Sequence, residues 1–217
     1  MTSPEVELRR VWQRAVDRDH DRVLDALLEH HREPHRRYHT ATHVMWVLRH
    51  LAELIDELPV DERNHHDVAA ILVAALFHDV IYDPTSSANE ANSATLAHRA
   101  LTEVGWPASR TDHVVLMILD TATHRPSSAD AALLIDADLA VLAADAAGYQ
   151  AYVNGVRAEY GHVSDTGWRI GRANVLRSFM QQPQLFATEA GRARYERRAR
   201  ANIAAELAAL EADPLHD

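Results

Sequence analysis

Histidine or aspartate residues lie in apolar surroundings at four places in the chain, the weakest of them at His124, and together they could hold a metal ion. His43 shares a helical face with the apolar residues that follow it, so its ring is expected to point inward. The pair His78-Asp79 ends a run of seven apolar residues, and Asp136-Ala-Asp138 lies within another apolar segment. A carboxylate is costly to bury in such surroundings unless something pairs with it.

Two imidazoles and two carboxylates would suit a hard or borderline divalent ion and leave positions open for water and substrate. The chain has 15 histidines, so a single histidine means little, and it has no cysteine, so a metal site must use histidine and carboxylate. A buried His-Asp contact can also be a satisfied polar pair without a metal. The recurrence of such pairs in apolar elements favours the metal site. Five histidines outside these elements are expected at the surface, namely His30, His31, His65, His66 and His113.

Helical phase distinguishes the two aspartates at 136 and 138. The residues three and four positions from Asp138 are all large and apolar, whereas those around Asp136 include alanines and lie nearer the edge of the buried stripe. Positions two apart on a helix differ by about 200°, so both carboxylates cannot point into one small site. We therefore predict that Asp138 is the ligand and that it lies on the more buried face.

The order His43, His78-Asp79, Asp138 resembles the signature of the HD superfamily of metal-dependent phosphohydrolases, over about residues 38–142. Three segments look like those of a bacterial group described as predicted metal-dependent HD phosphohydrolases: Phe77-His-Asp-Val-Ile-Tyr-Asp83, Asn89-Glu-Ala-Asn-Ser93 and Leu134-Ile-Asp-Ala-Asp-Leu139. The block Tyr38-His-Thr-Ala-Thr-His43 also looks like one in cyclic nucleotide phosphodiesterases, which are distant relatives. The resemblance implies that His43, His78, Asp79 and Asp138 bind the metal.

Further polar residues near these motifs are candidates for other roles. The resemblance implies that His39 faces the substrate as a proton donor. Asp83 and Glu90 follow the His-Asp pair and could orient the attacking water or hold a second ion, or could be ordinary solvated acids. Arginine binds phosphate in a bidentate fork, which makes Arg36 and Arg37 candidate substrate contacts, although surface arginines are common. His124, at the end of another apolar helix, is a weaker candidate for substrate binding.

The elements that carry these residues are predicted to be helices throughout. Alanine, leucine, arginine and glutamate are abundant, whereas glycine and proline are scarce, so we expect an all-α fold. One compact HD-type helical domain is expected over residues 1–217, with the motif-bearing core at about 38–142 and additional C-terminal helices at 148–212. Turn signals and apolar periodicity predict helices at about 4–18, 21–32, 40–58, 64–81, 89–104, 109–124, 129–145, 148–160, 166–182 and 188–212. The fourth, apolar on all sides, should be central.

The net charge of the chain indicates which kinds of molecule it is expected to bind. With 22 basic and 32 acidic residues the formal charge is −10, which argues against long nucleic acids, because proteins that bind them neutralise phosphates with lysine and arginine. A small phosphorylated substrate remains compatible, because a bound metal dominates its local field. The chain starts with a charged amphipathic pattern and has no apolar run long enough to span a bilayer, so a cytoplasmic protein without membrane partners is expected. Apolar faces on the terminal helices would permit a homodimer.

The predicted function is a metal-dependent phosphohydrolase that acts on a nucleotide or another small phosphate ester. The cofactor would be a divalent ion among Mn, Fe, Co, Ni, Zn and Mg, which lowers the pKa of a bound water and polarises the phosphoryl oxygen. His39 is the candidate acid for the leaving oxygen. Three alternatives remain: a di-iron oxygenase of the HD type, a metal- or nucleotide-binding regulatory protein without turnover, and a helical scaffold without metal.

Overall fold

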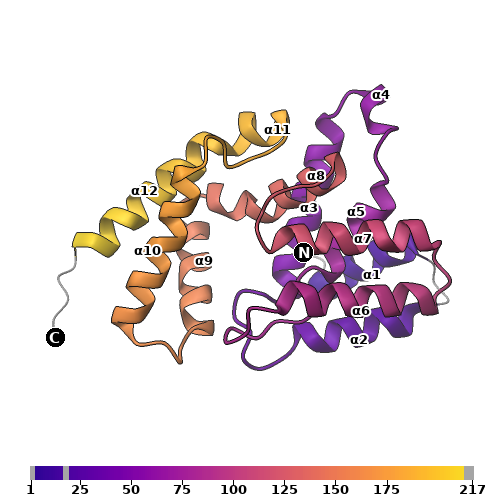
Figure 1. The fold of residues 1–217 in the computed structure, drawn as a ribbon, viewed down its shortest axis with the longest axis horizontal. Coiled ribbons are helices and arrows are strands. Elements are labelled where there is room, and N and C mark those ends of the chain that lie inside the picture. The colour runs from indigo at the N-terminus through magenta and orange to yellow at the C-terminus, as the bar shows by residue number, and fades with distance from the viewer. Residues whose placement is uncertain (1–2, 17–19, 213–217) are drawn as a thin grey trace.

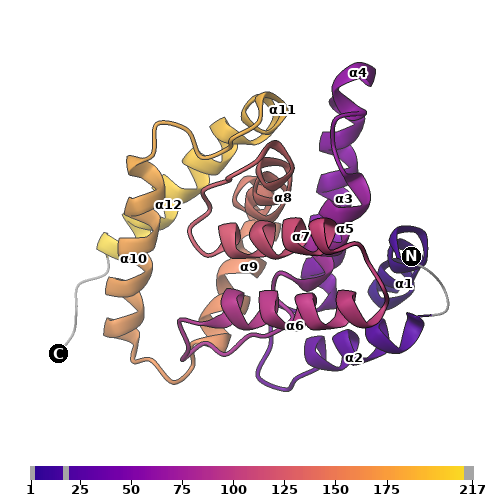
Figure 2. The same ribbon diagram turned by 45° about the vertical axis from the view of Figure 1, so that its right-hand side comes forward.

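The computed structural model describes residues 3–16 and 20–212, and these residues form helices and no strand. The all-α prediction is therefore confirmed. Figures 1 and 2 show the helices of the N-terminal half packed around α5, with α9, α10 and α12 forming a separate layer beside them. The elements are α1 (Pro4–Ala15), α2 (Asp21–His31), α3 (Ala41–Glu57), α4 (Val60–Arg63), α5 (Val68–Phe77), α6 (Asn89–Glu103), α7 (Ala108–Thr121), α8 (Ala129–Leu139), the 3₁₀ helix η2 (Ala140–Ala143), α9 (Ala146–Glu159), α10 (Asp165–Gln181), α11 (Glu189–Gly191), the π-helix η3 (Arg192–Glu196) and α12 (Arg197–Ala212).

The central helix α5 packs against α1, α3, α7 and α8, and seven of its ten residues are buried. It is shorter than the predicted helix at 64–81. At its start the Asp67 side chain accepts a hydrogen bond from the Ala70 amide, which fixes the first turn. At its end the carbonyls of Asp79 and Val80 accept hydrogen bonds from the Arg36 guanidinium, so the chain leaves the helix just after His78. This early ending places His78 and Asp79 at a turn.

Two other predicted helices are divided in the structure. The helix expected at 129–145 ends at Leu139 and tightens into η2, so that α9 begins at Ala146 with Asp145 as its N-cap. The helix expected at 188–212 contains the π-helix η3 between α11 and α12. Single π-turns of this kind are frequent near functional sites. None of the described helices has the length and apolarity needed to cross a bilayer.

The layer of C-terminal helices joins the core through α8, η2 and α3. The carboxylate of Asp136 accepts three hydrogen bonds across this junction. One of its carboxylate oxygens accepts from the Ala187 amide at 2.7 Å, and the other accepts from the Thr188 amide at 2.8 Å and the Thr188 hydroxyl at 2.6 Å. Gly191 lies so close that a Cβ there would collide with this carboxylate. Asp136 therefore fastens the loop before α11 to α8.

Candidate metal centre

Four side chains from α3, α8 and the turn after α5 converge at the end of α5. The Nε2 atoms of His43 on α3 and His78 after α5 lie 3.2 Å apart. The Oδ1 atom of Asp138 on α8 lies 3.3 and 3.5 Å from these two nitrogens. The Oδ2 atom of Asp79 lies 3.2 and 3.1 Å from the same nitrogens. All four residues predicted as ligands are thus brought together.

The donor atoms fit a divalent ion. Ligand atoms that each lie about 2.0–2.2 Å from one ion lie about 3.0–3.5 Å from one another. The two nitrogens have this spacing, and so does each nitrogen with each carboxylate. His43, His78 and Asp138 form a group whose donor atoms lie within 4.8 Å of one another. The Nδ1 atom of His78 lies 2.9 Å from the carbonyl oxygen of Ala75, so donation to this carbonyl leaves the Nε2 lone pair facing the centre. Two imidazole lone pairs facing each other at this distance are best satisfied by a cation between them.

Electrostatics keep the two carboxylates of the centre ionised. Burial alone would raise the pKa of Asp138, but hydrogen bonds from His124, His43 and His78 hold it well below the usual range. Burial likewise opposes ionisation of Asp79, and the neighbouring histidines lower its pKa well below the usual range. Both acids are therefore negative at neutral pH, as ligands of a divalent ion must be.

His39 lies beside the centre and is held by a residue that sequence analysis did not single out. Its Nδ1 atom lies 2.7 Å from Glu159 Oε2, and its Nε2 atom lies 4.0 Å from Asp79 Oδ2. The ring is stacked on Tyr82, with 4.1 Å between ring centroids. With Nδ1 held by Glu159, the Nε2 atom of His39 faces the candidate metal ligands. This arrangement agrees with the substrate-facing role predicted for His39 without testing it.

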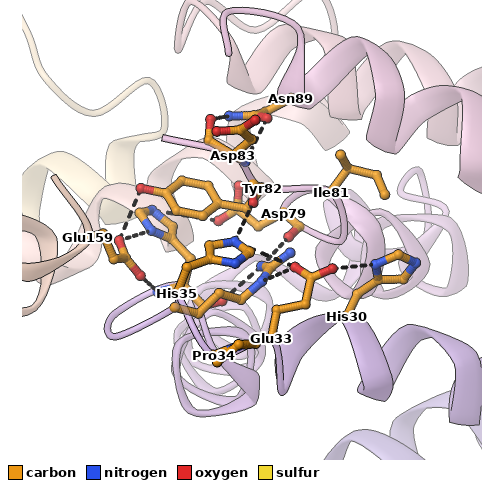
Figure 3. Close-up of polar contacts among 12 residues, drawn as sticks. His30, Glu33, Pro34, His35, Asp79, Ile81, Tyr82, Asp83, Asn89 and Glu159 are labelled. Carbon is orange, nitrogen blue, oxygen red and sulfur yellow. Dashed lines mark hydrogen bonds and ion pairs between the residues drawn. The ribbon is translucent and has the colours of Figure 1, made fainter. Parts of the chain in front are cut away.

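Glu159, near the end of α9, organises the segment that leads into α3. One carboxylate oxygen accepts hydrogen bonds from three consecutive amides, those of residues 37–39. The other faces His39 and accepts a hydrogen bond from the Tyr82 hydroxyl, which Figure 3 shows. Four residues earlier, Gly155 lets α9 approach closely, because a Cβ there would lie 3.1 Å from the Cβ of Tyr38. The pKa of Glu159 falls to about 2, since burial opposes ionisation but the hydrogen bonds and the charge of His39 outweigh it. The sequence has no signal for this role, because Glu159 lies 120 residues from its partner.

His124 also lies next to the ligands. Its Nε2 atom is 3.6 Å from Asp138 Oδ2, and its ring lies edge-on to Phe179 of α10. Its backbone adopts the left-handed conformation, with φ of 52°, which is uncommon outside glycine and costs free energy. The turn after α7 thus holds His124 against Asp138. Its predicted contact with substrate remains a prediction, and the position is suitable for it.

The two candidate arginines have different surroundings. The Arg36 side chain is fully buried and donates to the backbone carbonyls of His39, Asp79 and Val80 and to Glu33. Arg36 thus joins the turn after α5 to the segment before α3. A substrate contact was predicted for its guanidinium, which binds backbone carbonyls instead. Arg37 is exposed and donates to the carbonyls of Pro34 and Arg36.

Asp83 and Glu90, the two candidate acids, lie on the loop after α5 and in the first turn of α6. Asp83 is exposed and accepts hydrogen bonds from the amide and hydroxyl of Thr85, while its backbone pairs with the side chain of Asn89 (Figure 3). Glu90 lies near enough to Tyr160 to raise the pKa of that hydroxyl, after the larger effects of burial and of Glu159. Neither acid has a described contact with the four converging residues. We therefore propose no catalytic role for either acid.

The burial predicted for the two aspartates on α8 is wrong, although the choice of Asp138 for the cluster agrees with the geometry. Asp136 is fully buried, whereas the Asp138 side chain is 15% exposed. The helical pattern could not reveal that the C-terminal layer covers the Asp136 face, nor that the Asp138 face borders an open site.

We expect Asp136→Asn to lower stability while the folded protein keeps its metal. The NH2 group of asparagine would replace one of the two accepting oxygens and face the Ala187 amide or the two Thr188 donors. An unsatisfied buried polar group costs about 1–3 kcal/mol. Urea denaturation and elemental analysis of the folded fraction would measure the two effects. Loss of metal at unchanged stability would show that Asp136, and not Asp138, faces the ion.

Two of the histidines expected at the surface belong to a second His-Asp group, at the start of α8. His66 Nδ1 and His113 Nε2 lie 2.6 and 2.8 Å from the two carboxylate oxygens of Asp130. The Asp67 amide also donates to this carboxylate. All three side chains are buried or half-buried, and together they tie α8 to α7 and to the turn before α5. This group is a satisfied polar contact of the kind that can be mistaken for a metal site in sequence.

His31, also expected at the surface, is buried at the end of α2, and neither ring nitrogen has a hydrogen-bond partner among the described residues. Burial, with a smaller contribution from the charge of Arg36, lowers the pKa of His31 to about 3. The unfolded chain binds this proton near pH 6.5, so the folded state loses stability as the pH falls from 6.5 towards 3. The loss reaches about 2 kcal/mol at pH 5.

His31→Leu should therefore unfold at a higher urea concentration than the unchanged protein, with a larger gain at pH 5 than at pH 8. The matched control is His65→Leu, because His65 is exposed. An equal gain at both pH values would contradict the buried neutral state of His31.

Comparison with known families agrees with this geometry. The HD domain family matches residues 40–143, which run from the N-cap of α3 to the end of η2 and include His43, His78, Asp79 and Asp138. Residues 40–143 therefore form an HD domain, a domain typical of metal-dependent hydrolases. Neither the curated proteins nor the solved structures contain a match to the chain. His39 and Glu159 both lie outside the matched residues.

Proposed function

We propose that this protein is a metal-dependent phosphohydrolase that acts on a small phosphate ester, with a nucleotide as the first candidate. The observation that carries the proposal is the pairing of two features. The Nε2 atoms of His43 and His78 lie 3.2 Å apart, and an oxygen of each carboxylate lies 3.1–3.5 Å from both nitrogens. Beside them, the Nε2 atom of His39 lies 4.0 Å from Asp79 Oδ2. A metal site alone would serve binding, but a positioned acid beside it serves turnover.

His43, His78, Asp79 and Asp138 would hold the ion. When bound, a divalent ion supplies a water of lowered pKa and polarises a phosphoryl oxygen. The two carboxylates would formally balance the charge of a divalent ion, and the two imidazoles would bind it as neutral ligands. Of the ligand side chains, Asp79 and Asp138 are about 15% exposed, so the open side of the site lies along these acids.

His39 would donate a proton from Nε2 to the leaving oxygen. Glu159 keeps the proton on Nδ1 and fixes the ring plane, so only Nε2 can exchange a proton with the substrate. Stacking on Tyr82 prevents the ring from turning away. A general acid positioned in this way contributes roughly 10²–10⁴-fold to a rate.

A substrate screen tests the proposal. Phosphomonoesters, phosphodiesters and nucleotides would be offered to metal-stripped protein, with Mn, Fe, Co, Ni, Zn or Mg added back, and the products followed by phosphate release and chromatography. We expect metal-dependent hydrolysis of at least one class, with none in His78→Ala. Tight metal binding with no hydrolysis of any class would contradict the proposal and favour a binding protein.

A further inference from the structure

A cavity of about 890 Å³ adjoins the candidate metal centre and reaches His43 and Asp138. Its walls come from α3, α8, η2, α9 and the π-helix η3, so it lies between the HD domain and the C-terminal helices. Small side chains on α8, η2 and α9 leave the space open, and Tyr38 and Tyr152 line the part next to His43. The volume lies within the range of cavities that bind small molecules.

Trp46 lines this cavity and is unusually exposed for its size. It lies three residues after His43 on α3, so both side chains belong to one face of the helix. Half of the Trp46 side-chain surface is exposed, the largest exposed aromatic surface among the described residues. Its ring is flanked by the Arg49 guanidinium at 5.0 Å and by His50. An exposed indole on a cavity wall is a suitable platform for a flat ring.

The charges around the cavity do not favour a chain of phosphates there. Arg37, Arg194 and Arg198 line it together with three acids, so the formal charges balance. Arg194 is already paired with Glu53, at 2.8 Å, and with Glu57. Phosphate chains are normally bound by several unpaired cations or backbone amides. The cavity is therefore better suited to an uncharged group than to a polyphosphate.

We propose that this cavity binds an uncharged, flat aromatic ring in the organic part of the substrate, and that Trp46 is the residue on which the ring stacks. The inference rests on the proposed function for one point only, that the phosphate of the same molecule lies at the metal centre. Trp46 is then a specificity-determining residue, which selects esters that carry a ring over esters that do not. Stacking of one base on an aromatic side chain typically changes affinity by about 5- to 150-fold.

Adenosine is a direct probe of the ring site, because it has the ring and no phosphate to hydrolyse. Its binding to the purified protein would be measured by calorimetry, with ribose as the ring-free comparison. We expect adenosine to bind, ribose not to bind, and Trp46→Leu to weaken adenosine binding at least fivefold. The matched control is Trp106→Leu, since Trp106 also carries a stacked arginine, at 4.4 Å, but lies outside the cavity. Thermal unfolding would verify that both variants are folded.

Equal adenosine affinity in Trp46→Leu and the unchanged protein would overturn the inference, as would an equal loss in Trp106→Leu or no adenosine binding at all. The result is separable from the proposed function, because adenosine binding requires no hydrolysis. An inactive protein that binds adenosine through Trp46 would contradict the phosphohydrolase and keep the ring site. A protein that hydrolyses esters but binds adenosine equally well without Trp46 would support the phosphohydrolase and contradict the ring site.

Discussion

Replacing His78 by alanine should remove the metal from the protein while leaving the fold intact. The Nε2 atom of His78 lies within 3.1–3.5 Å of three other donor atoms, so its loss opens one side of the cluster and leaves two carboxylates without a shared cation. Elemental analysis after metal loading and dialysis should give about one or two equivalents for the unchanged protein and none for His78→Ala. Asp138→Asn should have the same effect, because it removes a charge from the ligand set.

A control separates the metal site from its surroundings. His113→Ala disrupts a histidine in the second His-Asp group, which has a similar contact distance but no converging fourth ligand. It should keep its metal. Full retention in both His78→Ala and Asp138→Asn would show that the ion binds elsewhere.

The second large effect concerns turnover. His39→Ala should keep the metal and lose roughly 10²–10⁴-fold in rate, because it removes the proton donor and no ligand. A substrate with a good leaving group, such as a nitrophenyl ester, should lose less, since its leaving oxygen needs little protonation. Parallel measurement of metal content and of rates on two esters distinguishes the roles. If metal and activity were lost together, His39 would be a ligand.

Glu159→Gln gives a graded version of the same experiment. The amide keeps the shape of the side chain but offers His39 a weaker and less certain acceptor, so the ring loses its fixed orientation. We expect a loss of about 10²-fold, the scale of a small misplacement of a catalytic group, with metal retained. A rate equal to that of the unchanged protein would show that His39 needs no positioning by Glu159.

Sequence reasoning could recover the parts of the site that local patterns encode. The apolar run before His78 and the helical face of His43 indicate that both histidines point inward. The choice of Asp138 is supported by the family resemblance, because helical phase predicted the burial of Asp136 and Asp138 the wrong way round. The ends of the helices were harder to predict from the sequence. Arg36 ends α5 by binding carbonyls that are 43 and 44 residues away in the chain, a contact with no local signature.

Long-range contacts also explain the functional residues that were missed or misplaced. Glu159 acts on His39 across 120 residues, and Asp136 is buried by a loop some 50 residues later. The candidate roles of Asp83, Glu90 and Arg36 were based on their nearness in sequence to the motifs. In the structure, Asp83 accepts hydrogen bonds from Thr85 in its own turn, and Glu90 lies near Tyr160. Arg36 donates to backbone carbonyls.

The most direct test of the central claim is a titration of metal into stripped protein while phosphate release is followed. The ester would be the best substrate from the screen, and bound metal would be counted in the same samples. We expect activity to rise in proportion to the ion bound and to saturate when the site of His43, His78, Asp79 and Asp138 is filled, at one or two equivalents. Full activity in the stripped protein, or saturating metal without any phosphate release, would contradict a metal-dependent phosphohydrolase.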